Sequence, residues 1–538
     1  MLSRFSILAG SQLLVGILIV GCSAAVPGLR DTLSTTSTAA ATGVCAGTPV
    51  TGGFQTGDGT SSNAFVICNA DQLNHFASYC TYVAPSNCSG LNFQLGADID
   101  LANTPYIPVN YFSGTFDGNS KTVSNWVYGE IDPNATSGGG GTIESDGALP
   151  ASLRNIDYNV GFFRQLGTTA TVKNLNLTNI AVIGRMFTGG LVGHMFSGAT
   201  IDHCHVSTAG GNEADVMDRN YTKGMVLGYQ NFSSGGNDGH TGGLIGTAEN
   251  GTTLSNSSFT GLVRSSQHVG GLVGDALGIN ITNSYTTGAS YSSDGNHGGL
   301  VGAWESSSVG FGISNSFSTM TITATASGGG GLVGTIRAGF ITNSYYMGTV
   351  NGNSGYTGGF IGSAGGPNVG ALVTISKCFA LANVEGSTFV GGFLGQSLSG
   401  GHITISDSYY IGNVAFTSGN AGGFIGEIAN AFTTLNRVYA AGTLIDNSNG
   451  TGTGAAVTKG ALVGTITLAS AVNDSFADLN LTSAALVGTT NSGVIDGVSS
   501  VQSTVNMQTA TTYSANTWDF NTVWTVAPGV NGGYPTLR

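Results

Sequence analysis

The chain has 538 residues, of which 88 are glycine, and 41% of its residues are hydrophobic but only 8% are charged. This balance excludes a disordered polyelectrolyte, because disorder requires low hydrophobicity and high net charge. Collagen is excluded because the glycines follow no three-residue period, and the formal net charge of −13 offers no basic surface to a nucleic acid. A surface of Ser, Thr, Asn and Gly is typical of an extracellular repeat protein.

The first residues predict export. A mostly apolar stretch from Phe5 to Val20 is too short and too interrupted for a membrane-spanning helix, which favours a signal peptide. It is followed by Gly21-Cys22, and Ile-Val-Gly-Cys22 resembles the lipobox of bacterial lipoproteins. The resemblance implies a signal peptide at 1–21 and a lipid on Cys22 that anchors the chain to a membrane. The alternative is an ordinary signal peptide with a chance cysteine.

The resemblance to lipoproteins also predicts a location. Ser23, in place of Asp, favours the outer membrane if the bacterium has one, so we expect an exported protein anchored by lipid at the bacterial cell surface. Residues 22–43 are rich in Thr, Ser and Ala, which is typical of a flexible tether.

Four cysteines lie within 44–156, which we expect to form an N-terminal capping region: Cys45, Cys68, Cys80 and Cys88. Export permits disulfides, and four cysteines allow three connectivities. The short spacing favours a bond from Cys80 to Cys88, which leaves Cys45 to pair with Cys68. A zinc site is the alternative, but the chain has no Cys-x-x-Cys pair.

A pentad of Gly-Gly-(Leu/Phe)-(Val/Ile/Leu)-Gly recurs and marks a repeat. Copies begin at Gly189, Gly242, Gly270, Gly298, Gly330, Gly358, Gly391 and Gly422, with degenerate copies at Gly460 and Ala484. The first interval of 53 residues predicts two units, with a weak copy at 224–228, and the next six intervals are 28 to 33 residues. Each pentad is followed by a second signature, in which small polar residues precede an aromatic residue, as in Ile281-Thr-Asn-Ser-Tyr285.

The repeat predicts an all-β fold, a parallel β-solenoid at 157–500 and most simply a right-handed β-helix. Apolar residues alternate with polar ones, as in strands, and a unit of about 30 residues cannot bury its own core. Each strand must therefore pair with its counterpart in the next unit, about 4.8 Å away. The glycines are expected to supply positive φ at corners and close approach between coils. Shared columns are expected for Leu272 with Leu332, Ile281 with Ile341, and Tyr285 with Tyr345. Cys204 and Cys378, alone within repeats, are expected to be small buried residues.

The pentads resemble the GLUG repeat family of bacterial secreted and surface proteins. Phe93–Leu101 and Phe112–Asn119 resemble the segment that precedes such repeats, and Asn531–Leu537 resembles the closing segment. The last residues, 501–538, are expected to form a cap whose aromatic side chains cover the open end of the stack: Trp518, Phe520, Trp524 and Tyr534.

Two polar clusters could bind a metal, and each has a simpler interpretation. On a strand, Asp202-His203-Cys204-His205 would place both histidines on one face, but one strand supplies only two ligands. His240, His268 and His297 each precede a pentad, which predicts a column of imidazoles in successive coils. We interpret both clusters as surface residues and predict no metal and no cofactor.

The sequence also predicts no catalytic residue. The GLUG family includes immunoglobulin A-type metallopeptidases, but this chain has no His-Glu dipeptide and therefore no His-Glu-x-x-His zinc motif. Parallel β-helices also include lyases and glycosidases, and glycoside hydrolysis usually needs two carboxylates about 5–9.5 Å apart. Asp275 and Glu305 follow one pentad, and Asp238 and Asp294 precede others, without a recurring basic partner.

The function predicted is that of a lipid-anchored, non-catalytic adhesin or binding scaffold, which uses the faces and loops of the solenoid. Its partners would be the membrane, through the N-terminal lipid, and a surface glycan or protein, and we expect no nucleic acid and a monomer. One alternative is a polysaccharide-degrading β-helix enzyme, and another is a purely structural envelope protein.

Overall fold

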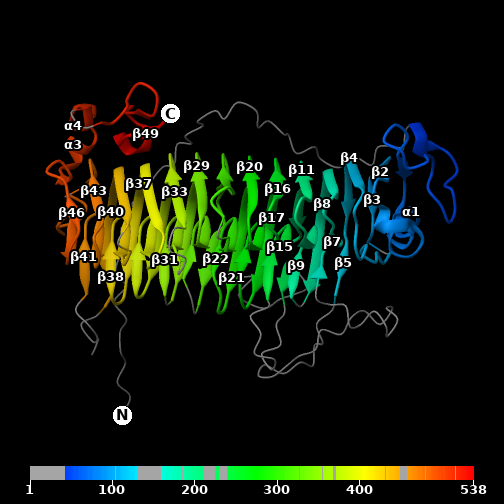
Figure 1. The fold of residues 1–538 in the computed structure, drawn as a ribbon, viewed down its shortest axis with the longest axis horizontal. Coiled ribbons are helices and arrows are strands. Elements are labelled where there is room, and N and C mark those ends of the chain that lie inside the picture. Colours follow the sequence, from blue (N-terminus) through cyan, green and yellow to red (C-terminus); the bar gives the residue numbers. More distant parts are fainter. Residues whose placement is uncertain are drawn as a thin grey trace, which may run out of the picture.

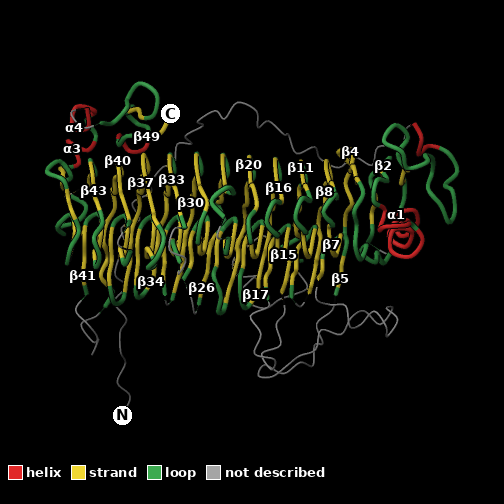
Figure 2. The backbone as a smooth tube through the Cα atoms, in the orientation of Figure 1, coloured by secondary structure: helices red, strands yellow, loops and turns green. Residues whose placement is uncertain are grey.

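The computed structural model describes residues 43–538 except for 103, 130–158, 185, 211–223, 229–238, 307, 326–327, 354, 367–370, 431, 449–456, 479 and 515–516. The expected signal peptide, Cys22 and nearly all of the tether at 22–43 lie outside the described residues. The described part is an elongated stack of short strands that run across its long axis (Figure 1). Strands dominate, and the helices lie towards the two ends of the stack (Figure 2). Within this part, no helix has the length and apolar character needed to cross a bilayer.

Three parallel sheets run along the stack, and their described strands are as follows. Sheet 1 contains β1 (Phe65–Ile67), β2 (Asn92–Leu95), β3 (Ile99–Asp100), β4 (Thr115–Ser124), β5 (Val127–Tyr128), β8 (Thr171–Gly184), β11 (Thr200–Asp202), β12 (His205–Thr208), β13 (Val226–Gly228), β16 (Thr252–Ser255), β17 (Ser258–Ser265), β20 (Ile279–Thr282), β21 (Tyr285–Ser292), β24 (Gly312–Ser314), β25 (Phe317–Ser318), β26 (Thr321–Ala324), β29 (Gly339–Thr342), β30 (Tyr345–Gly352), β33 (Leu372–Ser376), β34 (Phe379–Gly386), β37 (His402–Phe416), β40 (Thr433–Asp446), β43 (Ala471–Asn473), β44 (Phe476–Asp478), β46 (Val494–Ile495) and β47 (Ser500–Gln502). Sheet 2 contains β7 (Phe163–Leu166), β10 (Val192–Met195), β15 (Ile245–Ala248), β19 (Val273–Ala276), β23 (Val301–Trp304), β28 (Val333–Ile336), β32 (Ile361–Ala364), β36 (Leu394–Ser397), β39 (Ile425–Ile428), β42 (Val463–Ile466) and β45 (Val487–Thr490). Sheet 3 contains β6 (Asn159–Val160), β9 (Phe187–Gly189), β14 (His240–Gly242), β18 (Val269–Gly270), β22 (His297–Gly298), β27 (Gly329–Gly330), β31 (Tyr356–Gly358), β35 (Phe389–Gly391), β38 (Asn420–Gly422) and β41 (Thr458–Gly460).

The remaining elements lie near the ends of the described chain. They are the α-helices α1 (Ala70–Ser78), α3 (Thr504–Met507) and α4 (Ala510–Ser514), the short helical turns η1 (Gly43–Ala46), η2 (Tyr79–Val83), η3 (Pro85–Cys88) and η6 (Asn531–Gly533), and an antiparallel pair, β48 (Trp524–Thr525) and β49 (Thr536–Leu537). The fold is therefore mostly β with parallel sheets, as the sequence predicts.

Each repeat passes through sheet 3, then sheet 2, then sheet 1, and pairs in register with the next repeat. In one repeat these strands are β14, β15, β16 and β17. Ile245 pairs with Val273 in sheet 2, and Leu254 pairs with Ile281 in sheet 1. The side chains inside form one continuous hydrophobic core because equivalent residues lie above one another along the stack.

The predicted columns are confirmed, with one intervening repeat in each. Ile313 lies between Ile281 and Ile341 in sheet 1, and Leu300 lies between Leu272 and Leu332 through backbone hydrogen bonds. Phe317 lies between Tyr285 and Tyr345, with ring centroids 5.1 and 4.8 Å apart.

The 53-residue interval is a single repeat with an insertion, so the prediction of two units is wrong. Gly189 pairs directly with Gly242 in sheet 3, and Val192 pairs with Ile245 in sheet 2. The supposed weak copy at 224–228 includes β13, which joins sheet 1 between β8 and β17. The segment resembles a pentad in sequence, but its strand, β13, belongs to sheet 1 and not to sheet 3 or sheet 2.

The pentad glycines are needed for close approach between coils, not for positive φ. None of the described glycines in the eight full pentads has a left-handed backbone. A methyl group on Gly271 would overlap the carbonyl oxygen of Gly299 and lie 2.6 Å from Met320 Sδ. The expected positive φ is found at other glycines of the repeats, such as Gly261, Gly288 and Gly412.

Polar residues of the second signature also adopt the left-handed conformation, at a corner that recurs in successive repeats. One such column has φ values of 47° to 55° and comprises His203, Asn256, Asn283, Asn315, Asn343, Lys377, Asp407, Arg437 and Asp474. Asn and Asp tolerate this conformation better than other residues with a side chain. Because His203 lies at such a corner, 202–205 is not one strand: β11 ends at Asp202 and β12 begins at His205.

A buried serine follows each corner in most repeats, and the two free cysteines occupy the same column. The backbone N–H of Ser284 donates to Ser316 Oγ, and the N–H of Ser316 donates to Ser344 Oγ. Cys204 N–H donates to Ser257 Oγ in the same way, and Cys378 N–H donates to Ser408 Oγ. Both cysteines are buried and free, which confirms the prediction for them.

Because serine is the usual residue in this column, we expect Cys204→Ser and Cys378→Ser to leave stability almost unchanged. Each new hydroxyl can donate to the carbonyl two residues earlier, as Ser316 Oγ does to Ser314 O at 2.8 Å. The combined loss should be below about 1.5 kcal/mol, comparable with one ordinary hydrogen bond. Urea unfolding measures it, and a loss above about 4 kcal/mol would show that the column does not accept serine at these positions.

The N-terminal region joins the stack and closes it with a helix. β4 pairs in parallel with β8, so residues before 157 already form part of sheet 1. α1 lies at this end of the stack (Figure 1), and the Phe76 ring packs 5.1 Å from Phe116. Disulfides join Cys45 to Cys68 and Cys80 to Cys88, the pairing that the spacing favours.

The C-terminal aromatic segment lies on the side of the stack rather than over its end, so this part of the cap prediction is wrong. Trp524 lies 6.1 Å from the rings of both Tyr409 and Tyr439, which point outward from sheet 1. Trp518 packs 6.1 Å from Phe476. The last strand of sheet 2, β45, remains largely exposed.

Candidate functional site

A tight corner between sheets 3 and 2 brings polar side chains of different repeats together. The pentad glycines form this corner: a methyl group on Gly246 would lie 2.5 Å from the Thr188 nitrogen and 2.6 Å from the Gly193 oxygen. Because no side chain fits between the sheets there, the residues that flank the pentads face one another. We call this feature the glycine corner.

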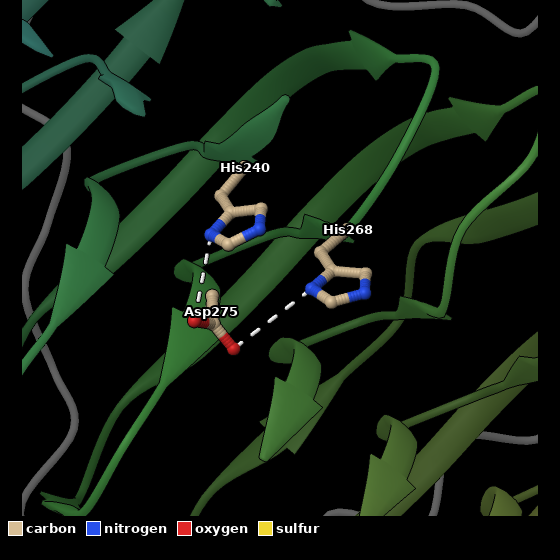
Figure 3. Close-up of side chains that lie close together, drawn as sticks. All are labelled: His240, His268 and Asp275. Atoms are coloured by element: carbon tan, nitrogen blue, oxygen red, sulfur yellow. Dashed lines mark ion pairs between the residues drawn. The ribbon is translucent and has the colours of Figure 1, made fainter. Parts of the chain in front are cut away.

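Three titratable side chains meet at the glycine corner (Figure 3). His240 Nδ1 lies 3.4 Å from Asp275 Oδ2, and His268 Nδ1 lies 3.8 Å from Asp275 Oδ1. The two imidazole rings are stacked, with centroids 4.7 Å apart and planes 15° apart. One potential ligand atom from each of the three residues lies within 4.8 Å of the others.

The three side chains come from separate strands, so the fold and not the local sequence assembles them. His240 begins β14, and His268 immediately precedes β18 in the next repeat. Asp275 lies in β19 of sheet 2, directly after its pentad. Register holds the group together, because Thr241 pairs with Val269 and so places His240 beside His268.

Burial makes the site unfavourable for charge. The side chains of His240, His268 and Asp275 are 14%, 17% and 8% exposed. Burial, with a smaller contribution from Glu305, raises the pKa of Asp275 to about 7. Burial, with smaller contributions from His240 and Arg337, lowers the pKa of His268 to about 3. Neither His268 Nδ1 nor Asp275 Oδ1 has a hydrogen-bond partner among the described residues.

His297 does not join this column, so the predicted column of three histidines is wrong in its third member. His297 pairs with Val269, one position later than His268 in the repeat, and its side chain points into the core. There its Nε2 lies 2.7 Å from Ser290 Oγ. Asn296 occupies the equivalent outward position, and its Nδ2 donates to His268 Nε2 at 3.4 Å.

The buried His297 predicts a loss of stability in acid. Burial lowers its pKa from 6.5 to about 3, so the folded chain holds the ring neutral while the unfolded chain protonates it near pH 6.5. The contribution of the neutral His297 ring to the free energy of unfolding is therefore fully present above about pH 6.5. It falls between about pH 6.5 and 3, by up to ~1.4 kcal/mol per pH unit. His297→Val, which copies Val269, should reduce this slope.

Urea unfolding at pH 7 and pH 5 measures the effect of His297→Val. The wild type should lose about 2 kcal/mol more than the variant between these values, because one proton fewer is bound on unfolding of the variant. Equal losses in both proteins would show that His297 is not held neutral in the folded state.

The other polar cluster expected from the sequence forms a surface pair. Asp202 Oδ2 lies 2.9 Å from His203 Nδ1, and the His203 side chain is 54% exposed. His205 lies on the next strand, where its Nδ1 is 2.8 Å from Ser258 Oγ. The corner at His203 therefore separates the two histidines that a continuous strand would have placed together.

A second candidate surface is a column of stacked aromatic rings on sheet 1. We call it the aromatic ladder: Tyr285, Phe317, Tyr345, Phe379, Tyr409 and Tyr439. Neighbouring ring centroids lie 4.8–5.1 Å apart and their planes within 7° of parallel. The C-terminal segment buries Tyr409 and Tyr439, whereas the first four rings are partly exposed.

Comparisons with known proteins give little beyond this geometry. No protein-family model and no curated protein matches the chain. A solved structure described as that of a candidate immunoglobulin A1 protease from Bacteroides ovatus is 19% identical, with 90% of this chain and 95% of that chain covered and a TM-score of 0.30. That similarity is too low to support any statement about the function of this chain.

Proposed function

We propose that the protein is an exported, lipid-anchored and non-catalytic binding scaffold, a parallel β-solenoid of the GLUG type that holds a partner on its aromatic ladder. The lipobox-like sequence at Cys22 supports export and lipid anchoring, and the GLUG-like pentads support the repeat architecture. The in-register pairing of successive repeats supports a solenoid. We infer the right hand from the usual handedness of parallel crossovers.

The observation that carries the proposal is the continuation of the aromatic ladder beyond its covered part. The C-terminal segment already packs Trp and Tyr side chains onto Tyr409 and Tyr439. Tyr285, Phe317 and Tyr345 continue the same column without that cover. On the same strands, Met347 is 37% exposed beside the ladder, which widens the apolar strip.

The geometry of the rings favours a polypeptide over a sugar as the partner. Because the rings stack on one another, their faces are occupied and only their edges point outward. A sugar packs on an aromatic face, whereas ring edges attract the faces of other aromatic rings. Trp524 makes such a tilted contact, 50° from the planes of Tyr409 and Tyr439. The proposed ligand is therefore a protein segment with exposed aromatic side chains.

The test is a binding array of proteins and glycans, probed with residues 23–538, which lack the lipid. We expect protein ligands whose affinity falls about 10-fold or more in a double variant, Phe317→Thr with Tyr345→Thr, because each aromatic contact contributes about 0.5–1.5 kcal/mol. Phe432→Thr is the matched control, since Phe432 is 54% exposed and stacks on His402, outside the ladder.

Each other outcome of this test contradicts the proposal. Binding that the double variant retains as fully as the control would show that the ligand binds outside the aromatic ladder. Binding of glycans alone would show that the ligand is a sugar and not a polypeptide. Absence of binding would favour the structural envelope protein. Release of reducing sugar from any polymer, assayed in parallel, would favour the polysaccharide-degrading enzyme.

A further inference from the structure

We propose that His240, His268 and Asp275 form a binding site for one divalent transition-metal ion of the zinc type. This site lies at the glycine corner and not on the aromatic ladder, so it is independent of the proposed function above. Nothing in the order of residues along the chain groups these three side chains, because they belong to three strands of two sheets.

The donor set suits a borderline metal ion. Two imidazole nitrogens and one carboxylate oxygen are ligands of zinc and of other late divalent metals, whereas calcium and magnesium prefer oxygen ligands alone. The three donors lie within 4.8 Å of one another. Zinc holds nitrogen and oxygen at about 2.0–2.2 Å, so its ligands lie roughly 3.3–3.5 Å apart, and small side-chain rotations close the difference.

The burial of Asp275 gives an independent reason for a bound cation. The residue is 6% exposed, and its Oδ1 has no hydrogen-bond partner among the residues that the structure describes. A buried carboxylate is costly unless it is paired or coordinates a metal, and the two imidazoles 3.4 and 3.8 Å away pair with its charge only when they are protonated. A cation between Asp275 and the two imidazoles would supply the missing charge and occupy the free oxygen.

Neighbouring residues could orient the imidazole of His268 for coordination. Metal-bound histidines usually donate their other ring N–H to a polar partner, which fixes the ring. Asn296 lies beside His268 Nε2, and Thr335 Oγ1 donates to Asn296 Oδ1 at 3.1 Å. Thr335 Oγ1 also contacts Ser363 Oγ at 2.6 Å, so its hydroxyl can reverse direction. Rotation of the Asn296 amide would then present an oxygen acceptor to the Nε2–H of His268.

The other histidines of the described chain lack a third ligand, which makes this site distinct. His203 pairs with Asp202 and His194 pairs with Glu249, each as one imidazole and one carboxylate. Among the described residues, His240, His268 and Asp275 alone bring three such groups together. Three protein ligands leave a fourth position for water or for a group on a partner.

The repeats themselves indicate which substitutions the fold accepts. Thr247 and Ala303 occupy the position of Asp275 in the adjacent repeats, so Asp275→Thr removes the ligand and keeps a residue found in that column. Asn296 occupies the position of His268, so His268→Asn does the same. His203→Gln is the matched control, because it breaks an exposed His–Asp pair that has no third ligand.

Zn²⁺ alone is the probe, titrated by calorimetry into the purified full chain without a histidine tag, with Co²⁺ absorption as a second readout. We expect one ion per chain, a tetrahedral-type Co²⁺ spectrum, and at least a 100-fold loss of affinity in Asp275→Thr and in His268→Asn. This exceeds the roughly 10–100-fold that loss of an outer partner costs. His203→Gln should bind as the wild type does, and circular dichroism should show all variants folded.

Three results would overturn the proposal. They are absence of Zn²⁺ binding by the wild type, affinity that Asp275→Thr and His268→Asn both retain, and a loss of equal size in His203→Gln. Because no step uses the aromatic ladder, failure here would leave the array result unaffected, and failure of the array would leave this site standing.

Discussion

Gly271→Ala should destabilise the stack more than any other methyl-sized change considered for this chain. The added methyl group would overlap the carbonyl oxygen of Gly299 and crowd Met320 Sδ and Thr286 Cγ2, at 2.6 and 2.8 Å. The carbonyl is part of the next coil, so neighbouring repeats would have to separate to relieve the overlap. We expect a loss of about 3 kcal/mol or more, at the upper end of the range for overpacked cores, measured as a lower urea midpoint.

Gly310→Ala is the matched control for this prediction. A methyl group at Gly310 would contact nothing within 4 Å, and its backbone is not left-handed. The control should therefore change stability by less than about 0.5 kcal/mol, or raise it slightly. Equal midpoints for Gly271→Ala and wild type would mean that the coils do not approach one another at the pentads.

Trp524→Ala should release the C-terminal segment from the aromatic ladder. Trp524 is fully buried and packs 4.5 Å from Trp518 as well as against two rings of the ladder. Truncation of a buried Trp costs about 3–5 kcal/mol, which is enough to open a segment held mainly by this cluster. Hydrogen exchange should then rise in 503–538 and remain low in the strands of sheets 2 and 3.

The control for Trp524→Ala is Val505→Ala, a change at a side chain that is 71% exposed. It should leave hydrogen exchange in the segment unchanged. If Trp524→Ala also left the segment protected, the aromatic contacts would not be what holds it in place. If it unfolded the whole stack, the segment would be part of the core rather than a cover on its side.

Much of the fold could be predicted because the repeat constrains it at fixed spacing. Leu272 keeps its place within the pentad, and Ile281 keeps its place four residues before the aromatic residue of the second signature. Their columns therefore follow from aligning each signature with its counterpart in the next repeat, although the length of chain between the two signatures varies. The insertion after Gly189 could not be recognised from the sequence, because residues 224–228 resemble a pentad although their strand, Val226–Gly228, lies in sheet 1. The strands with which a segment pairs decide which sheet it joins, and its sequence similarity to the pentad does not.

The candidate site could be predicted only in part, and the reason is register. His240 and His268 stand two residues before their pentads, whereas His297 stands one before, and a shift of one residue turns a side chain to the other face of a strand. That spacing was present in the sequence and could have excluded His297. Asp275 could not be assigned, because its proximity depends on how tightly sheets 3 and 2 fold together at the glycines.

The sequence likewise could not predict which surface the C-terminal aromatic segment covers. Trp518, Trp524 and Tyr534 indicate a cluster that must be buried, but not against what. The end of the stack and the exposed aromatic ladder both offer apolar area. The structure shows that the segment packs on the aromatic ladder. The hydroxyl of Tyr439 accepts a hydrogen bond from Asn531 Nδ2 and donates one to the Pro535 carbonyl oxygen, across 92 and 96 residues of sequence.

The central claim is that successive repeats lie in register on one another, and one disulfide measurement tests it directly. Thr260 and Thr287 are exposed partners on β17 and β21, with their Oγ1 atoms 3.1 Å apart. In a Cys204→Ser, Cys378→Ser background, Thr260→Cys with Thr287→Cys should form a disulfide on mild oxidation, because adjacent strands are about 4.8 Å apart and disulfides span 4.4–6.8 Å between Cα atoms. Thr260→Cys with Met347→Cys, whose positions lie three repeats apart, should stay reduced. A first pair that remains reduced, or a second pair that links as readily, would contradict the stacking of repeats.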